Sequence, residues 1–189
     1  DIVIAAEHCS TELVNFMVTH ARGLICVPMT EARADHLELP PMTDRNTAPL
    51  GTAFTISVEA REGVTTGISA SDRARTIQLL ADPEAGPEDF SRPGHIFPLR
   101  AKDGGVLVRA GQTEASVDLC RMAGLSSTAV VCEIMSEDGS MARMPELEQF
   151  ATQHDLYILT VADLISYRLA KERLIERGED TSLPTTHGN

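Results

Sequence analysis

The chain has 189 residues, a length that predicts a single domain with a substantial core. Its formal net charge of −12 argues against nonspecific binding to nucleic acid, which requires a basic surface. No apolar run approaches the length of a membrane span, so we expect no membrane association. The four cysteines form no CxxC pair, so a zinc site with the usual cysteine spacing is not expected. We expect the cysteines to be free, in a reducing, cytoplasmic setting. On so acidic a molecule, a site for an anion must be a local positive pocket.

The predicted elements mix strands and helices along the first half of the chain. In order, the patterns predict a strand over residues 1–6, a helix from 10 or 11 to 22, a strand over 24–29, a short helix after Thr30, a loop over 40–51, a strand over 54–60 and a helix from Ser71 to Pro83.

The second half continues this alternation. It predicts a turn or short helical piece at residues 87–90, strands over 96–99 and 106–109 around a turn at 103–105, a helix over 113–123 and a strand over 129–135. A hairpin-like loop at 136–140, a helix over 145–154, a strand over 157–160 and a last helix over 161–176 follow. Residues 177–189 are typical of a flexible tail or linker, so the domain is expected to span 1–176. Short joins between strands imply some antiparallel pairing. We therefore expect an α+β fold with a mixed sheet flanked by helices.

Residues 92–114 (RPGHIFPLRAKDGGVLVRAGQTE) contain a candidate anion site. Arg109 ends a predicted strand, and after a tight turn Thr113 is a residue type that caps helices. The first N–H groups of a helix have no partner within the helix and lie at its positive end, which suits a phosphate. Arg109 could add a forked, charge-assisted contact. Alternatively, Thr113 is only a cap and Arg109 only a surface cation.

Glu133 and His95 are candidates for proton transfer. Glu133 falls in the apolar run VVCEIM, where burial would raise the pKa of its carboxyl toward the range of a base that works near neutral pH. Strand alternation could instead place Glu133 on a solvated face, and the residues alone leave these two readings even. His95 follows Pro93–Gly94, where a turn could present the imidazole to a pocket; a loop histidine with a structural hydrogen bond is the alternative.

Four stretches of the chain resemble the family of 3,4-dihydroxy-2-butanone 4-phosphate synthases. They read GLICVPMT (23–30), GTAFTISVEAREGVTTGISASDRARTI (51–77), RPGHIFPLRAKDGGVLVRAGQTEASVDLCRMAGL (92–125) and VVCEIMSEDGSMARMPELEQFA (130–151). The resemblance implies a single α+β domain that forms a homodimer with active sites at the interface. It also implies conversion of D-ribulose 5-phosphate to 3,4-dihydroxy-2-butanone 4-phosphate and formate in riboflavin biosynthesis, with Mg²⁺ or Mn²⁺.

The resemblance also implies roles for individual residues. Glu133 would be the acid–base carboxylate, and His95 the histidine required for activity. The residues that would hold the substrate and its phosphate are Asp1, Arg109, Ala110, Gly111, Gln112 and Thr113, together with Glu133.

The chain departs from the family pattern at two places. The family's acidic, metal-binding loop would precede Asp1, so we expect an upstream segment to supply a metal ligand. Gln112 stands where the family has a metal-binding histidine. Its amide oxygen can bind a hard cation but is neutral and weaker as a ligand. The alternative reading is therefore a catalytically altered or silent homologue that acts on or binds another sugar phosphate.

Overall fold

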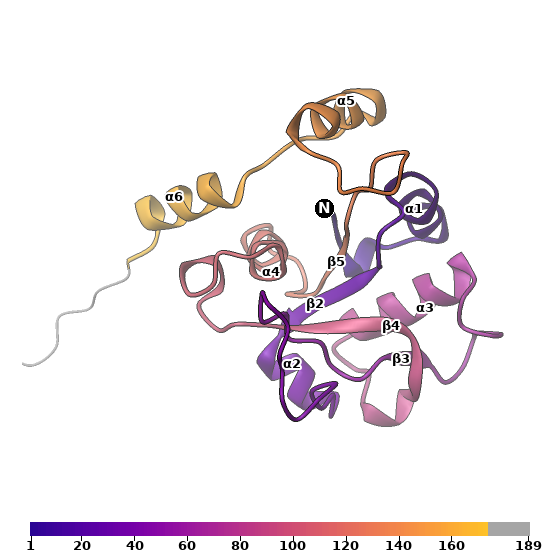
Figure 1. Ribbon diagram of the computed structural model, residues 1–189. Helices are drawn as coiled ribbons and strands as arrows, with labels where there is room; N and C mark the ends of the chain where they lie inside the picture. Colours follow the sequence, from indigo (N-terminus) through magenta and orange to yellow (C-terminus); the bar gives the residue numbers. More distant parts are fainter. Residues whose placement is uncertain (174–189) are drawn as a thin grey trace, which may run out of the picture.

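A five-stranded mixed sheet lies at the centre of residues 1–173, the part of the chain that this computed structural model describes (Figure 1). The strand order is β1-β5-β2-β4-β3. The strands are β1 (Ile2–Ala5), β2 (Cys26–Thr30), β3 (Val58–Ala60), β4 (Phe90–Ala101) and β5 (Ala129–Cys132). Strands β2 and β4 run parallel, whereas β1–β5, β2–β5 and β3–β4 are antiparallel. The expected α+β fold with a mixed sheet is confirmed.

Helices and short helical turns connect these strands. The α-helices are α1 (Thr11–Phe16), α2 (Glu31–His36), α3 (Ala70–Ala81), α4 (Gln112–Met122), α5 (Met144–His154) and α6 (Val161–Lys171). The shorter turns are η1 (Ala6–His8), η2 (Met17–Ala21), η3 (Pro87–Asp89) and η4 (Gly105–Leu107). Hydroxyl groups at the N-caps accept an N–H of the first turn in α1, α2, α3 and α6. Helix α3 starts earlier than predicted because Ser69, rather than Ser71, is its cap.

The two faces of the sheet pack against different helices. The larger core cluster joins one face to α1, α2 and α3, and includes Val27, Met29, Val130 and Cys132 from the strands. The intervening strand residues Cys26, Leu99 and Val131 point to the other face, as the period of two requires. Helix α4 contacts β1, β5, β2 and β4 and lies to the left of β5 and β2 in Figure 1, with α1 and α3 to the right.

The strand predicted over 106–109 is wrong. Gly104 and Gly105 both have positive φ, and the chain turns into the short helix η4 instead of extending. Two backbone N–H groups, of Val108 and Arg109, donate to the Gly105 carbonyl at 3.0 and 3.1 Å. Of the apolar, β-branched residues that suggested a strand, Val106 is instead buried between α4 and α6.

Four other elements differ from the prediction. Strand β4 is one element of 12 residues that includes Pro93–Gly94, because β3 pairs along its first half and β2 along its second. The strand expected over 54–60 is regular only at Val58–Ala60. Residues 157–160 form no strand but link α5 to α6, with Tyr157 fully exposed. The last helix ends at Lys171, and the predicted tail 177–189 lies outside the described residues. Among those described residues, no helix is both long and apolar enough to span a bilayer.

Candidate functional site

The sheet register places Asp1, Glu133, Leu24 and His95 at about the same level of four neighbouring segments, just outside the ends of β1, β5 and β2 and in the middle of β4. When the pairing of β1 with β5 is extended by one residue, Asp1 lies opposite Glu133. The parallel pairing of β2 with β4, extended by two residues beyond Cys26 and Phe97, places Leu24 level with His95. Neighbouring strands are about 4.8 Å apart, so the backbones at Glu133 and His95 are separated by roughly 10 Å. The fold therefore places three residues that are far apart in the sequence at about the same level of the sheet, on separate strands.

Glu133 lies at an irregularity in the sheet. Strand β5 pairs with β2 through Val131 and Cys26, but the next bridge joins Ile134 to Arg22. Three residues of one segment therefore face two of the other, which is a β-bulge. Bulges locally increase the twist and change the direction in which a side chain points, and they are frequent beside active sites. No local pattern in the chain indicates this feature.

A backbone N–H group fixes the Glu133 carboxylate. The Oε2 atom of Glu133 accepts a hydrogen bond of 2.9 Å from the N–H of Leu24. Gly23 leaves the necessary room, because a Cβ at this position would lie 2.4 Å from the Glu133 carbonyl oxygen and 2.7 Å from Oε2. Burial, with a further contribution from the Glu133 charge, raises the pKa of the nearby Cys26 thiol to about 12. The half-buried carboxylate thus has a neutral thiol, not a thiolate, beside it.

His95 is held by a carboxylate from the adjacent strand. Its Nδ1 atom hydrogen-bonds to Oε1 of Glu59 in β3, and the His95 side chain is 46% exposed while that of Glu59 is 16% exposed. An acceptor at Nδ1 favours the proton on that nitrogen, which leaves Nε2 as the nitrogen that can exchange a proton with a ligand. The predicted turn at Pro93–Gly94 is wrong, since His95 is presented by the middle of β4.

The loop between β3 and α3 completes the surroundings of Glu59. Gly67 packs directly on Glu59, so that a Cβ at Gly67 would overlap its carboxylate. Asp72 anchors this loop by accepting from the Gly67 N–H at 3.0 Å and the Thr65 hydroxyl at 2.8 Å. These bonds, with the Thr65 hydroxyl the strongest, lower the pKa of Asp72. The polar side chains of residues 65–73 therefore include a loop anchor and a helix cap, the latter being Ser69.

Arg109 is held in place by protein acceptors on both of its terminal nitrogens. Nη1 donates to Oε2 of Glu114 at 2.6 Å, and Nη2 donates to the Leu50 carbonyl at 3.0 Å. The other oxygen of Glu114, a side chain that is only 1% exposed, accepts from the Lys102 N–H at 3.0 Å. The guanidinium of Arg109 is thus held in one orientation, and its positive charge is already paired with the Glu114 carboxylate.

The start of α4 differs from the prediction in one respect. Gly111, and not Thr113, occupies the N-cap position, and no side chain caps this helix. Thr113 is buried in the first turn, whereas Gln112 and Ala110 are exposed beside it. A helix start without a side-chain acceptor offers its first N–H groups to a ligand, as the anion hypothesis requires.

Asp1 and Gln112 line the same cavity, which has a volume of about 710 Å³. Its walls come from β1, α4, α5 and residues 156–161, and most of the lining side chains are apolar. Arg109, Thr113, Glu133 and His95 are not part of this lining. Within the described part of one chain, the predicted residues are therefore divided between this cavity, the bulge at Glu133 and the outer half of the sheet.

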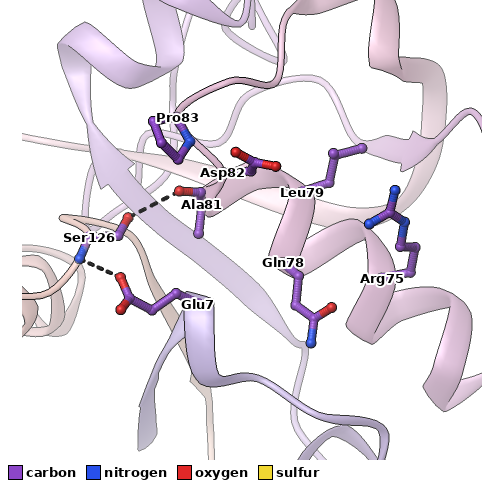
Figure 2. Close-up of a pocket in the computed structure, with 8 residues that line it drawn as sticks. All are labelled: Glu7, Arg75, Gln78, Leu79, Ala81, Asp82, Pro83 and Ser126. Carbon is purple, nitrogen blue, oxygen red and sulfur yellow. Dashed lines mark hydrogen bonds between the residues drawn. The ribbon is translucent and has the colours of Figure 1, made fainter.

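A second pocket, of about 750 Å³, contains none of the predicted residues (Figure 2). It lies between η1, the end of α3 and the turn before β5. Its lining residues are Glu7, Arg75, Gln78, Leu79, Ala81, Asp82, Pro83 and Ser126. The N–H of Ser126 donates to Glu7 at 2.6 Å, and its hydroxyl donates to the Ala81 carbonyl at 3.4 Å, as Figure 2 shows. These polar groups join segments of the fold.

The donors available for a divalent cation are oxygens. Over residues 1–173, no group of three or more His, Cys, Asp or Glu side chains is arranged to hold a metal. The carboxylate of Asp1 and the amide of Gln112, which line one cavity, match the hard-oxygen preference of Mg²⁺. Because Mg²⁺ retains several waters and often needs only one or two protein ligands, this sparse set fits such an ion.

Together these features describe a class of α+β proteins with a mixed sheet, a glutamate at a β-bulge, a carboxylate-bound histidine and a helix start without a side-chain cap. Comparison with known proteins identifies the family. The family model for 3,4-dihydroxy-2-butanone 4-phosphate synthase matches residues 1–167, and the chain belongs to this family.

Two curated relatives match the whole chain. The 3,4-dihydroxy-2-butanone 4-phosphate synthase of Pseudomonas aeruginosa is 56% identical over 189 residues, which are 100% of this chain and 52% of that protein. The riboflavin biosynthesis protein RibBA of Salinispora arenicola is 53% identical over 188 residues, or 100% of this chain and 45% of that protein. The chain thus spans about half the length of the curated relatives it matches.

Solved structures agree with this family. RibBX, a two-domain 3,4-dihydroxy-2-butanone 4-phosphate synthase from A. baumannii, superposes with a TM-score of 0.93 at 50% identity, covering 98% of this chain and 55% of that one. A synthase of the same name in complex with two magnesium ions gives a TM-score of 0.85 at 45% identity, covering 89% of this chain and 84% of that one. The family resemblance read from the sequence motifs is confirmed.

Proposed function

We propose that the chain converts D-ribulose 5-phosphate to 3,4-dihydroxy-2-butanone 4-phosphate and formate, a carbon–carbon lyase step of riboflavin biosynthesis. The observation that carries the proposal is the register, which places Asp1, Glu133 and His95 at about the same level of the sheet, with Glu133 at a bulge. A carboxylate at a bulge and a carboxylate-bound imidazole are two groups that can exchange protons with a small substrate. Membership of the synthase family supports the same reaction.

Glu133 and His95 have complementary roles in this proposal. Glu133 takes a proton from the sugar carbon during enolisation and returns one during ketonisation, held in orientation by the Leu24 N–H. His95 donates a proton to a leaving oxygen or orients it, with Glu59 fixing the ring. Formate carries away the carbon that is lost when the skeleton rearranges.

The first turn of α4 anchors the substrate's phosphate. The uncapped N–H groups lie just after Gly111, within five residues of Arg109 in the chain. Between Arg109 and Gly111, Ala110 has only a methyl side chain and so leaves room for a ligand. Fixing the anionic end of the sugar holds its reacting carbons in position, which lowers the entropic part of the barrier.

Gln112 would bind the divalent cation, Mg²⁺ or Mn²⁺, and Asp1 in the same cavity would contact the substrate. When bound, such an ion polarises the oxygens of the sugar. The Gln112→His variant tests this assignment, because imidazole is a better ligand than a neutral amide for many divalent metals. We expect tighter Mn²⁺ binding in calorimetry and a lower metal requirement for turnover. Unchanged metal affinity in this variant would argue against Gln112 as a ligand.

We also propose that the protein works as a homodimer in the cytoplasm. A dimer would bring the groups that one chain holds apart, at the cavity of Asp1 and at His95, to a shared interface. The exposed apolar side chains of residues 156–159 support such a contact. All four cysteines are free and buried, which suits a reducing compartment.

The Glu133→Gln variant tests the proposed reaction. The amide keeps the shape and can still accept from Leu24, but it cannot take a proton at neutral pH. We expect formate release from ribulose 5-phosphate to fall by about 10³-fold or more while the melting temperature stays near that of the wild type. Undiminished formate release in this variant would exclude Glu133 as the acid–base group.

A silent homologue that binds a sugar phosphate is the second candidate, and Gln112 in the cavity is the observation that favours it. Calorimetric titration with ribulose 5-phosphate and Mg²⁺, followed by a formate assay on the same sample, separates the two. Binding without turnover would favour the silent protein, whereas stoichiometric formate would favour the lyase.

A further inference from the structure

A buried ion pair joins α6 to α4 beside η4, the turn that leads into the proposed phosphate anchor. Arg168 of α6 is 4% exposed and Asp118 of α4 is 2% exposed, and Nη1 of Arg168 donates to Oδ2 of Asp118 at 2.7 Å. The remaining guanidinium nitrogens of Arg168 donate to both carboxylate oxygens of Glu172 at 2.6 and 2.7 Å. Such a fork fixes the plane of the guanidinium as well as its charge.

The same two side chains hold the backbone of η4. Nη1 of Arg168 also donates to the Gly104 carbonyl at 2.9 Å, and Oδ2 of Asp118 accepts from the Val106 N–H at 2.9 Å. Gly105 lies directly on the Asp118 carboxylate, where a Cβ would approach its oxygens to 2.2 Å. One donor and one acceptor of the turn are thus satisfied by a single buried ion pair.

Backbone hydrogen bonds connect this turn directly to Arg109. The N–H of Arg109 donates to the Gly105 carbonyl at 3.1 Å, and the N–H of Gly111 donates to the Arg109 carbonyl at 2.8 Å. The position of the Arg109 backbone therefore depends on the turn, and the turn depends on Arg168. Helix α6 also packs Leu164 against Val106, so its ionic and apolar contacts act at the same place.

We propose that Arg168 is a positioning residue for the phosphate anchor, acting through Asp118 and η4 rather than by contact with the substrate. The inference rests on the proposed function, because it concerns the site that would hold the phosphate of ribulose 5-phosphate. Its role would be to keep Arg109 and the start of α4 in one arrangement before the substrate arrives. A guanidinium is required, since lysine could keep one contact with Asp118 but not the fork to Glu172 and the bond to Gly104.

The test compares Arg168→Lys with Arg121→Gln as a matched control. Arg121 donates to the other oxygen of Asp118 at 3.0 Å but is 49% exposed and does not contact η4 by a hydrogen bond in the described structure. We expect Arg168→Lys to raise the KM for ribulose 5-phosphate, and the inhibition constant of inorganic phosphate, about tenfold while kcat changes less than about threefold. Arg121→Gln should leave all three constants within about twofold of the wild type.

A role limited to stability would instead lower the fraction of folded enzyme and leave KM unchanged, and that outcome would overturn the proposal. Glu172→Gln provides a milder variant, because Glu172 is at the surface and its loss leaves the Arg168–Asp118 pair intact. It should raise KM in the same direction by a smaller factor. An unchanged KM in both folded variants contradicts the inference.

Hydrogen exchange separates failure of this inference from failure of the proposed reaction. The amides of Val106, Val108 and Arg109 should exchange faster in Arg168→Lys, or in Glu172→Gln if the former does not fold, than in Arg121→Gln. This readout needs no turnover, so it decides the positioning role even if the wild type releases no formate. Equal exchange at these amides in all variants would show that Arg168 does not hold the turn.

Discussion

At the residue scale, Gly23 sets the conditions under which Glu133 can work. The steric contact is with backbone atoms of Glu133 as well as its carboxylate, so a side chain at Gly23 cannot be accommodated by a rotamer change. We expect Gly23→Ala to cost about 1–3 kcal/mol of unfolding free energy, the usual range for overpacking. Displacement of the carboxylate should reduce kcat about tenfold or more. Chemical denaturation and a formate assay would measure the two effects.

Gly124→Ala is the control for this substitution. Gly124 has φ +73° and nothing within 4 Å of an added Cβ, so alanine there meets strain but no clash. It should cost about 1 kcal/mol, the penalty of a left-handed conformation, without changing kcat. Equal activity losses in the two variants would mean that stability, and not the position of Glu133, limits activity.

The candidate site residues could be proposed from the sequence, but their partners in the fold could not. Glu133, His95 and Arg109 stand in short motifs whose composition suggests acid–base or anion-binding chemistry. Glu59, which holds His95, is 36 positions away, and Leu24, which holds Glu133, is 109 positions away. Such contacts depend on strand order and on a bulge, and neither leaves a local pattern in the chain.

At the element scale, the loop before α3 depends on one buried carboxylate. The pKa of Asp72 is lowered below its usual 3.8, mainly by the Thr65 hydroxyl and further by backbone N–H groups. A lowered pKa in the folded state means that Asp72 contributes its full stability above about pH 4, and that this contribution is lost as the pH falls through the lowered value. The loop that supports Glu59 should therefore keep its full stability at neutral pH and loosen only in acid.

Asp72→Asn should lower the melting temperature at pH 7, because the amide nitrogen cannot accept the bonds that the lost oxygen accepted. The difference from the wild type should shrink as the pH falls below 3.8, where the wild-type carboxylate also becomes protonated. Melting temperatures recorded from pH 7 to pH 2.5 would measure this trend. Asp44→Asn, in an exposed loop, is the control, and a difference that stayed constant with pH would refute the explanation.

Elements were predicted best where a local pattern and the final packing agree. The helices at α3 and α4 and the strand at β2 show both a suitable periodicity and matching burial. The failure at residues 106–109 has a physical cause, since two glycines with positive φ turn the chain before an apolar run that would otherwise extend. Residues 157–160 have strand composition, but in the described structure no neighbouring strand pairs with them.

At the scale of the whole molecule, the apolar link between α5 and α6 predicts self-association. Tyr157 is 103% exposed, and Leu156, Ile158 and Leu159 are between 41% and 53% exposed. Replacing both Tyr157 and Ile158 with serine should weaken the proposed dimer by about 2 kcal/mol or more, as loss of central apolar contacts usually does. Sedimentation velocity at micromolar concentration should then show a shift from dimer to monomer.

Formate release should fall in parallel if the active site needs both chains. Met42→Ser changes an exposed apolar residue in the loop before β3 and should affect neither property. A wild type that sediments as a monomer with full activity would contradict the dimer proposal.

The pairing of Arg109 with Glu114 has a consequence for how the protein attracts its ligand. The guanidinium is electrically balanced before any sugar arrives, and the surrounding molecule is acidic, so long-range Coulomb forces give an incoming anion no advantage. Recognition would then be decided at contact distance, by oriented peptide dipoles. Added salt should consequently speed encounter slightly by shielding the repulsion, the opposite of what basic phosphate-capturing surfaces do.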